Sequence, residues 1–195
     1  MQTKYRKTNK LGQVSDPSVP VCWDMGSDTC PKYEHIVHPF LPLYDENSTI
    51  LILGSLPSVK SREQMFFYGH PQNRFWKVIA ALTGEDVPTE IEKKKALLHK
   101  HHIALWDTIY SCDIVGSSDS SIKNVVPTDI MPIIRNSKIT RVFCNGSTSG
   151  KYYKRYQQKD TGIEAVVLPS TSPANAAFSL EKLIKAWNIG LGTSG

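Results

Sequence analysis

The sequence lacks the patterns that mark membrane, secreted and metal-binding proteins. No apolar run approaches the roughly 18 residues of a membrane-spanning helix, and the first residues contain no hydrophobic stretch typical of a signal peptide. The four cysteines form no CxxC pair, which argues against a zinc ribbon or an iron–sulfur cluster. We therefore expect a soluble intracellular protein with reduced thiols and no metal or other cofactor, located in the nucleus of a eukaryote or the cytoplasm or nucleoid of a prokaryote.

The sequence also lacks the short motifs of several common enzyme classes. Residues 54–58 (Gly-Ser-Leu-Pro-Ser) follow a strand-like run, but they have neither the Gly and Lys spacing of a P-loop nor a dinucleotide fingerprint. No G-x-S-x-G elbow is present, which argues against a serine hydrolase that would use Ser55 or Ser172. The chain also shows no internal repeats.

The composition is that of a single basic domain. At 195 residues the chain has the length of one domain with a sizeable core. The 23 Lys and Arg exceed the 18 Asp and Glu, and the net charge of +5 favours a polyanionic partner such as nucleic acid. Residues 1–45 are rich in Lys, Pro and Ser and show no sustained period. We expect an extended arm there, a domain over residues 46–189 and a flexible tail over residues 190–195.

Strand-like and helix-like patterns alternate along the domain. Apolar runs of strand length occur at residues 50–53, 103–106, 141–144 and 165–168. Helical patterns occur at residues 74–82, 89–100, 128–136, 148–158 and 179–188. Thr89 and Ser179 are the expected N-caps of two of these helices. The alternation predicts an α/β fold, in which helices cover both faces of a mainly parallel sheet.

The segment after the first predicted strand carries much of the candidate chemistry. In an open α/β sheet, ligands bind beyond the C-terminal ends of the strands, which is where this segment begins. Phe66, Phe67 and Tyr68 are hard to bury together in a loop, so at least one ring is expected to face a ligand. Phe75 and Trp76 are expected in the core.

Two polar side chains of this segment have two interpretations each. His70, which precedes Pro71, either shapes the turn or binds phosphate. The Asn73 carboxamide could hold an attacking water and hydrogen-bond a base edge, because it both donates and accepts. It could equally cap the helix that starts near Arg74, and from the residues alone capping is the simpler interpretation.

A second candidate loop follows the last predicted strand, at residues 169–176 (Pro-Ser-Thr-Ser-Pro-Ala-Asn-Ala). Its small and hydroxyl-bearing residues suit close approach to a sugar-phosphate backbone, although a plain strand-to-helix connection is the alternative. Residues 99–102 (His-Lys-His-His) resemble a metal tract, but cations at a helix end complement the helix dipole, which is the simpler interpretation. One of Asp107, Asp113 and Asp119 could reach the edge of the site.

Five segments occur in a characteristic order along the domain. They are residues 54–58, 67–76, 104–107, 112–122 and 168–175. Each motif is weak alone, but the ordered set resembles the hypoxanthine-DNA (deoxyinosine) glycosylase family of the uracil-DNA glycosylase superfamily. The resemblance implies a three-layer α/β/α sandwich around a central, mainly parallel four-stranded sheet.

The resemblance extends to mismatch-specific uracil-DNA glycosylases, which have a run similar to the His-Pro-Gln-Asn-Arg-Phe-Trp of residues 70–76. Those relatives carry a water-positioning Asn in the first motif, at the place where this chain has Leu56. The resemblance therefore implies that the catalytic carboxamide is Asn73. No lysine lies in either loop to form an imine, so we expect a monofunctional glycosylase.

The reaction implied by the resemblance is base flipping followed by hydrolysis of the N-glycosidic bond, which leaves an abasic site. Asn73 would orient the water and Tyr68 would stack on the extruded base. The implied base-binding residues are Gly54, Ser55, Leu56, Tyr68 and His70. The implied DNA-binding residues are Ser58, Ser170, Thr171, Ser172, Pro173, Ala174 and Asn175.

The expected partner is DNA containing deaminated bases, with hypoxanthine as the leading base and uracil as the main alternative. A monomer is expected to act on it, and no membrane is involved. Two other functions stay open at this point. One is a uracil or mismatch-specific uracil/thymine glycosylase, and the other is a non-catalytic nucleic-acid-binding module on the same fold.

Overall fold

The structure, a computed structural model, describes residues 32–191, and the residues from Tyr33 onward form one unit. Most of the predicted arm and the end of the predicted tail lie outside the described residues. No helix among the described residues is both long enough and apolar enough to cross a lipid bilayer.

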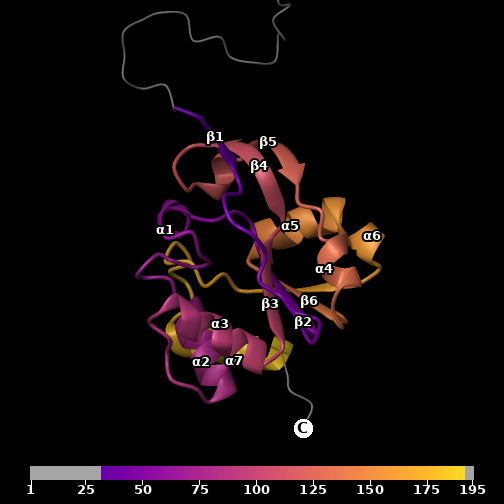
Figure 1. Cartoon of the computed structure of the whole chain (residues 1–195). Helices are drawn as coiled ribbons and strands as arrows, with labels where there is room; N and C mark the ends of the chain where they lie inside the picture. Colours follow the sequence, from indigo (N-terminus) through magenta and orange to yellow (C-terminus); the bar gives the residue numbers. More distant parts are fainter. Residues whose placement is uncertain (1–31, 192–195) are drawn as a thin grey trace, which may run out of the picture. The chain divides into compact units, whose positions relative to one another are not determined.

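A four-stranded parallel sheet forms the centre of the unit (Figure 1). Its strands are β2 (Ile50–Gly54), β3 (Ile103–Asp107), β6 (Arg141–Asn145) and β7 (Ala165–Leu168). They lie in the order β3-β2-β6-β7, and every neighbouring pair is parallel. The four predicted strands and the predicted parallel sheet are thus confirmed.

Helices cover both faces of this sheet (Figure 1). One group contains α2 (Phe75–Thr83), α3 (Ile91–Lys100) and α7 (Leu180–Leu191). The other contains α4 (Met131–Arg135), α5 (Ser147–Tyr156) and α6 (Gln158–Thr161), while the short α1 (Val59–Glu63) follows β2. The predicted three-layer α/β/α sandwich is confirmed, and α7 continues past residue 190, where the tail was expected to begin.

The helix starts differ from prediction in one detail. Ser179 accepts the backbone N–H of Lys182 through its Oγ, as an N-cap does. Thr89 was the other expected N-cap, but the N-cap position of α3 is the next residue, Glu90. The Glu90 side chain makes no capping hydrogen bond. Glu92 then supplies a negative charge in the first turn, which complements the helix dipole.

A second, antiparallel sheet of three strands was not predicted. Its strands are β1 (Glu34–Val37), β4 (Ile109–Ile114) and β5 (Lys123–Pro127), in the order β1-β4-β5, with the 3₁₀ helix η1 (Asp119–Ser121) between the last two. Strand β4 starts directly after β3, separated by Thr108 alone. The residues after position 32 that were assigned to the arm therefore include a paired strand, and Leu43 adds a further bridge to Leu105.

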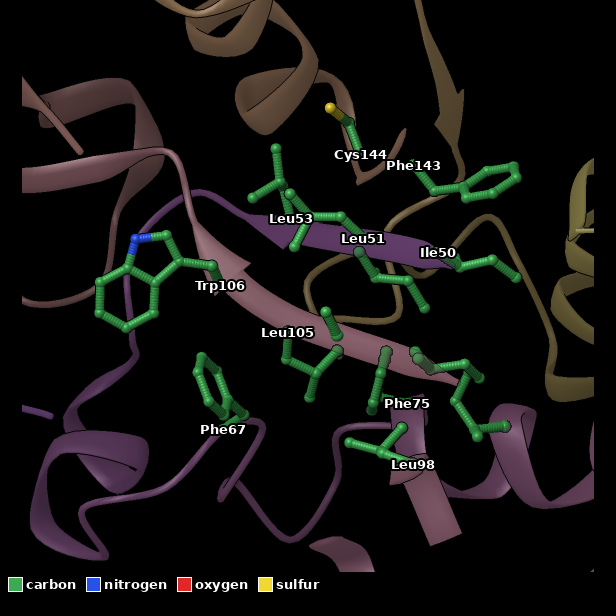
Figure 2. Packing of buried hydrophobic residues seen from close by; sticks show 14 of the residues in the cluster. Ile50, Leu51, Leu53, Phe67, Phe75, Leu98, Leu105, Trp106, Phe143 and Cys144 are labelled. Atoms are coloured by element: carbon green, nitrogen blue, oxygen red, sulfur yellow. The ribbon is translucent and has the colours of Figure 1, made fainter. Parts of the chain in front are cut away.

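The core gathers around β2 and β3, whose residues are all buried. Strands covered on both faces carry continuous apolar runs instead of alternating ones, which explains why these two were visible in the sequence. In Figure 2, Phe75 and Leu98 lie below these strands and Cys144 lies above them. Phe75 and Trp76 are buried as expected, and Phe66 and Phe67 are buried as well, which leaves Tyr68 as the partly exposed ring of that trio.

Candidate active site

A cleft of about 830 Å³ lies at the C-terminal edge of the parallel sheet. The ends of β2, β3, β6 and β7 all contribute residues to its lining, as expected for an open α/β sheet. Its volume is in the range of small-molecule and cofactor sites. The predicted site residues that line it are Gly54, Ser55, Leu56, Ser58, Tyr68, Asn73, Ser170, Thr171, Ser172, Ala174 and Asn175.

Two predicted site residues are not part of this lining. The described lining does not include His70, whose Nδ1 accepts the backbone N–H of Gln72 and so shapes the turn before Asn73. Pro173 is also absent from it, although both of its neighbours line the cleft. Residues 99–102, the possible metal tract, lie elsewhere and pair with carboxylates, His99 with Asp45 and Lys100 with Glu85. No group of three or more potential metal ligands occurs among the described residues.

Asn73 lies both in the cleft and at the start of α2. Its Oδ1 accepts the backbone N–H of Phe75 at 2.9 Å and the hydroxyl of Thr171 at 3.0 Å. The helix-capping interpretation and the site interpretation are therefore compatible. Because a carbonyl oxygen has two lone pairs, both are occupied, and the amino group Nδ2 is the part of the carboxamide that remains for a ligand.

Asn145, which the sequence analysis missed, fixes the orientation of Thr171. Its Nδ2 donates to Thr171 Oγ1 and its Oδ1 accepts the Thr171 backbone N–H, both at 2.9 Å. The Thr171 hydroxyl thus accepts from Asn145, and its single proton points to Asn73. Thr171 is completely buried, so this chain of amide, hydroxyl and amide is shielded from competing water.

Arg74 attaches the loop after β7 to the start of α2. Its guanidinium donates to the carbonyl oxygens of Thr171 (3.3 Å), Ser172 (2.5 Å), Asn175 (3.1 Å) and Phe178. All of these acceptors belong to residues 171–178, and the Arg74 backbone N–H also donates to Thr171. The arginine in the middle of the motif therefore shapes the second loop from inside and is not directed at solvent.

The inner end of the cleft is formed by Gly54, Asp107 and Tyr68. A Cβ on Gly54 would lie 2.2 Å from Asp107 Oδ1 and 3.5 Å from the Tyr68 hydroxyl oxygen. Any side chain at position 54 would collide with the carboxylate, so glycine is needed there for the carboxylate and the hydroxyl to approach the same space. Of the three aspartates considered from the sequence, Asp107 is the one that is buried at the inner end, and Asp119 lines the outer part.

His38 holds the Asp107 carboxylate in place. His38 Nε2 lies 2.9 Å from Asp107 Oδ2, and His38 Nδ1 lies 3.0 Å from the carbonyl oxygen of Phe40. The two ring nitrogens thus meet two oxygens, which fixes the orientation of both the ring and the carboxylate. Asp107 Oδ1 is not hydrogen-bonded by any described residue.

Tyr68 has an uncommon backbone and a buried hydroxyl. Its φ of 53° is in the left-handed region, and its ring stacks on Phe75 with centroids 3.8 Å apart. Its hydroxyl is buried and has no hydrogen-bond partner among the described residues. Burial, together with the nearby Asp107 charge, raises the pKa of Tyr68 far above its usual value, so the hydroxyl stays protonated. Asn145 acts in the opposite direction on this pKa, because its Nδ2 donates one N–H to Thr171 and has a second. A second N–H from Asn145 could meet only the oxygen of the Tyr68 hydroxyl, so the Tyr68 proton stays uncommitted.

The outer part of the cleft is rich in hydroxyl groups and poor in cations. Its hydroxyl-bearing residues are Ser55, Ser58, Ser61, Ser117, Ser118, Ser120, Ser147, Thr148, Ser170, Thr171 and Ser172. Arg62 is the cationic residue of the described lining, and its guanidinium donates to the Pro57 carbonyl oxygen at 2.9 Å. Ser58 caps α1 by accepting the Ser61 backbone N–H. Hydroxyl and backbone N–H groups are thus the main donors at this surface.

Comparisons with known proteins show the family of the chain. A family model described as the uracil DNA glycosylase superfamily matches residues 41–189. A protein named hypoxanthine DNA glycosylase from Methanosarcina acetivorans is 37% identical over 142 residues, which make up 72% of this chain and 89% of the relative. A protein of the same name from Methanosarcina barkeri is 34% identical over 155 residues, or 76% of this chain and 93% of the relative.

A solved structure has a similar fold. It is the solution NMR structure of a Methanosarcina acetivorans protein described as a uracil DNA glycosylase, with a TM-score of 0.67 and 34% sequence identity. The match covers 77% of this chain and 94% of that protein. The family match contains both loops of the cleft, and it confirms the resemblance carried by the sequence motifs. This chain belongs to the uracil DNA glycosylase superfamily.

Proposed function

We propose that this protein is a DNA glycosylase that removes hypoxanthine from DNA. The observation that carries the proposal is its similarity, over 72% and 76% of the chain, to two proteins named hypoxanthine DNA glycosylase. The cleft supports it, since a space of about 830 Å³ at the C-terminal edge of the sheet is large enough for a flipped nucleotide. The described residues of the cleft hold no lysine, which supports direct hydrolysis over an imine intermediate.

The proposed reaction is hydrolysis at C1′ of the flipped nucleotide. The bond between C1′ and the base nitrogen breaks, and its electron pair leaves with the base. Water forms the new bond to C1′, and its proton balances the charge of the departing base, so the products are an abasic site and free hypoxanthine. Donors near Gly54 and Ser55 would stabilise the charge that develops on the base, as preorganised hydrogen bonds do in other hydrolases.

Asn73 is the proposed catalytic residue, and the geometry gives it a definite orientation. Because Oδ1 is occupied by Phe75 and Thr171, Nδ2 would hold the oxygen of the attacking water by donating to it. One lone pair of the water would then be held by Asn73 while the other attacks C1′. The proposal thus retains the water-orienting role implied by the motif and assigns it to the amino end of the carboxamide.

The hydroxyl-rich outer part of the cleft is the proposed DNA grip. Ser58, Ser170 and Ser172 would contact phosphates on both sides of the flipped nucleotide through their hydroxyl groups. Thr171, which is buried and hydrogen-bonded to Asn73 and Asn145, would hold the shape of the loop. Ala174 and Asn175 would enter the space that the extruded base leaves in the duplex. His70 and Pro173 would act on the shape of the two loops, since the described cleft lining does not include them.

Base release from matched duplexes tests the proposal. Oligonucleotides that carry inosine, uracil or an undamaged base at one position are incubated with the protein, and abasic sites are then cleaved with alkali. We expect cleavage with inosine, and Asn73→Ala should slow it by about 10²- to 10⁴-fold with duplex binding largely retained.

Asn136→Ala is the matched control. Asn136 is exposed at the end of α4, where its Nδ2 donates to the Pro132 carbonyl oxygen far from the cleft lining. Release of uracil alone would favour a uracil glycosylase, and binding without any base release would favour a non-catalytic module. Near-normal hypoxanthine release by the Asn73→Ala variant would remove Asn73 from the catalytic role.

A further inference from the structure

Two polar groups at the inner end of the cleft, the Tyr68 hydroxyl and Asp107 Oδ1, are a hydrogen-bond donor and a hydrogen-bond acceptor. They are not hydrogen-bonded to each other. The Tyr68 hydroxyl is buried with no described hydrogen-bond partner, and its proton is uncommitted. Asp107 Oδ1 lies beside the same Gly54 backbone, while Oδ2 of that carboxylate is occupied by His38. Leaving a buried hydroxyl unpaired is unfavourable, so its retention at this point indicates a partner that arrives from outside.

The two groups form one donor and one fixed acceptor. Tyr68 offers an O–H, because it stays protonated in this surrounding. Asp107 offers the lone pairs of Oδ1, because His38 meets the carboxylate through the other oxygen, Oδ2. The absence of a side chain on Gly54 lets both groups lie close to its backbone. A ligand that fits here must present an acceptor beside a donor.

Deamination creates this pair on a base edge. Adenine has a ring nitrogen N1 that accepts and an exocyclic amino group that donates, and cytosine has the equivalent pair at N3 and N4. Deamination to hypoxanthine or uracil reverses both, giving a carbonyl oxygen that accepts beside a ring N–H that donates. A carboxylate placed at the ring nitrogen would attract the N–H of the deaminated base and repel the lone pair of the adenine or cytosine from which it derives. Guanine and thymine also carry a ring N–H beside a carbonyl oxygen, so this contact separates hypoxanthine and uracil from their parent bases and not from those two.

We propose that Asp107 and Tyr68 form a lactam reader, in which Asp107 Oδ1 accepts the ring N–H of the flipped base and the Tyr68 hydroxyl donates to the adjacent carbonyl oxygen. The inference rests on the proposed function and names the feature by which that site selects its substrate. Asp107 and Tyr68 are specificity-determining residues, and His38 is a positioning residue that keeps the carboxylate oriented. The substrate class is a base with a lactam edge.

The first test changes the substrate and leaves the protein intact. Duplexes carry inosine or 1-methylinosine opposite an abasic site, so that neither base is paired and both are equally free to flip. The methyl group replaces the ring N–H that Asp107 would accept. We expect hypoxanthine release to exceed 1-methylhypoxanthine release by about 100-fold or more, because a site built around a hydrogen bond strongly rejects an analogue that lacks it. Equal release would overturn the proposal.

The second test removes the Tyr68 hydroxyl. Because this group has no described partner, Tyr68→Phe should leave the melting temperature unchanged or raised while hypoxanthine release falls by about tenfold. Tyr110→Phe is the matched control, since Tyr110 is exposed on β4, outside the cleft lining. A lower melting temperature with unchanged release per folded protein would mean that the hydroxyl has a structural role, and would overturn its part in the reader.

The third test changes the carboxylate. Asp107→Asn should lose about 100-fold in hypoxanthine release, and Asp107→Ala should bring the ratio of inosine to 1-methylinosine release close to one. Asp113→Asn is the control, because Asp113 forms the same kind of pair with His35 at 2.7 Å but lies outside the cleft lining. A ratio unchanged by Asp107→Ala would overturn the proposal.

Binding separates this inference from the proposed function. If the protein releases no base at all, the affinities for inosine and 1-methylinosine duplexes still compare the two edges. Tighter binding of inosine that depends on Asp107 would support the reader in a protein without glycosylase activity. Equal affinities would overturn both the reader and its assigned substrate class.

Discussion

At the residue scale, the Thr171 hydroxyl connects two loops that are 98 residues apart in the chain. It accepts from Asn145 and donates to Asn73, so each neighbour restrains the rotation of the next. A catalytic carboxamide must be held within a narrow range of orientations to place a water, because small misplacements cost large factors in rate. The buried Thr171 supplies such a restraint for Asn73, the proposed catalytic residue.

Thr171→Val is therefore expected to lower the chemical step of hypoxanthine release by about tenfold, because the isosteric side chain can neither accept from Asn145 nor donate to Asn73. Thr171→Ser, which keeps the hydroxyl, should retain most of the activity. Single-turnover rates measure the chemical step separately from binding. Thr83→Val is the control, since the Thr83 hydroxyl donates to the Ile79 carbonyl oxygen within α2. Full activity of the valine variant would contradict the restraint.

The candidate segment around Asn73 was predictable at this scale, whereas Asp107 was considered as one of three unranked aspartates and Asn145 was not predicted. Asn73 and Tyr68 stand in a dense polar-aromatic run that the sequence displays directly. Asn145 is the last residue of β6, and Asp107 is the last residue of β3. Nothing local distinguishes them from ordinary strand ends. Their role arises because parallel strands end at one edge of the sheet, which a single sequence shows only after the strand order is known.

At the element scale, Arg74 makes the loop after β7 depend on the start of α2. Its guanidinium meets four carbonyl oxygens of residues 171–178, a pattern that a planar group with several fixed donors can satisfy and a lysine ammonium cannot. The loop that would grip DNA is thus shaped before DNA arrives. Such preorganisation lowers the entropy cost of binding.

Arg74→Lys should consequently destabilise the protein by about 2 kcal/mol and lower its melting temperature by about 4–8 °C, because several carbonyl groups lose a charged donor. The freed loop should also become a site of limited proteolysis, and the KM for inosine duplexes should rise. Arg135→Lys, at the end of α4, is the matched control. An unchanged melting temperature together with resistance to proteases would show that the loop holds its shape without Arg74.

The elements of the parallel sheet were predictable, and those of the antiparallel sheet were not. Strands β2 and β3 are apolar at almost every position because both of their faces are covered. Strand β4 (Ile-Tyr-Ser-Cys-Asp-Ile) mixes polar and apolar residues, and β5 ends in Pro127. Pairing of β1 with β4 joins distant parts of the chain, and the register between β4 and β5 is irregular. No local periodicity records such contacts.

At the scale of the whole molecule, the net charge of +5 and the composition of the cleft point in different directions. A basic protein is expected to bind DNA through many Lys and Arg contacts. The described cleft lining, however, contains Arg62 as its cation and Asp107 and Asp119 as its carboxylates. We therefore expect the general attraction to DNA and the grip on one nucleotide to be carried by different parts of the surface.

This separation gives a prediction for the salt dependence of binding. Counterion release depends on the phosphates that Lys and Arg neutralise, whereas hydroxyl and backbone N–H contacts release few ions. We therefore expect the preference for inosine duplex over undamaged duplex to be nearly independent of salt, while the affinity for either duplex falls as salt rises.

The dissociation constants of both duplexes, measured over a series of salt concentrations with the Asn73→Ala variant to prevent turnover, provide the two slopes. If Lys and Arg carried the specific grip, the inosine slope would be steeper than the undamaged slope by about one for each additional phosphate neutralised. Parallel slopes would place the specificity in the neutral donors of the cleft and in its buried inner end.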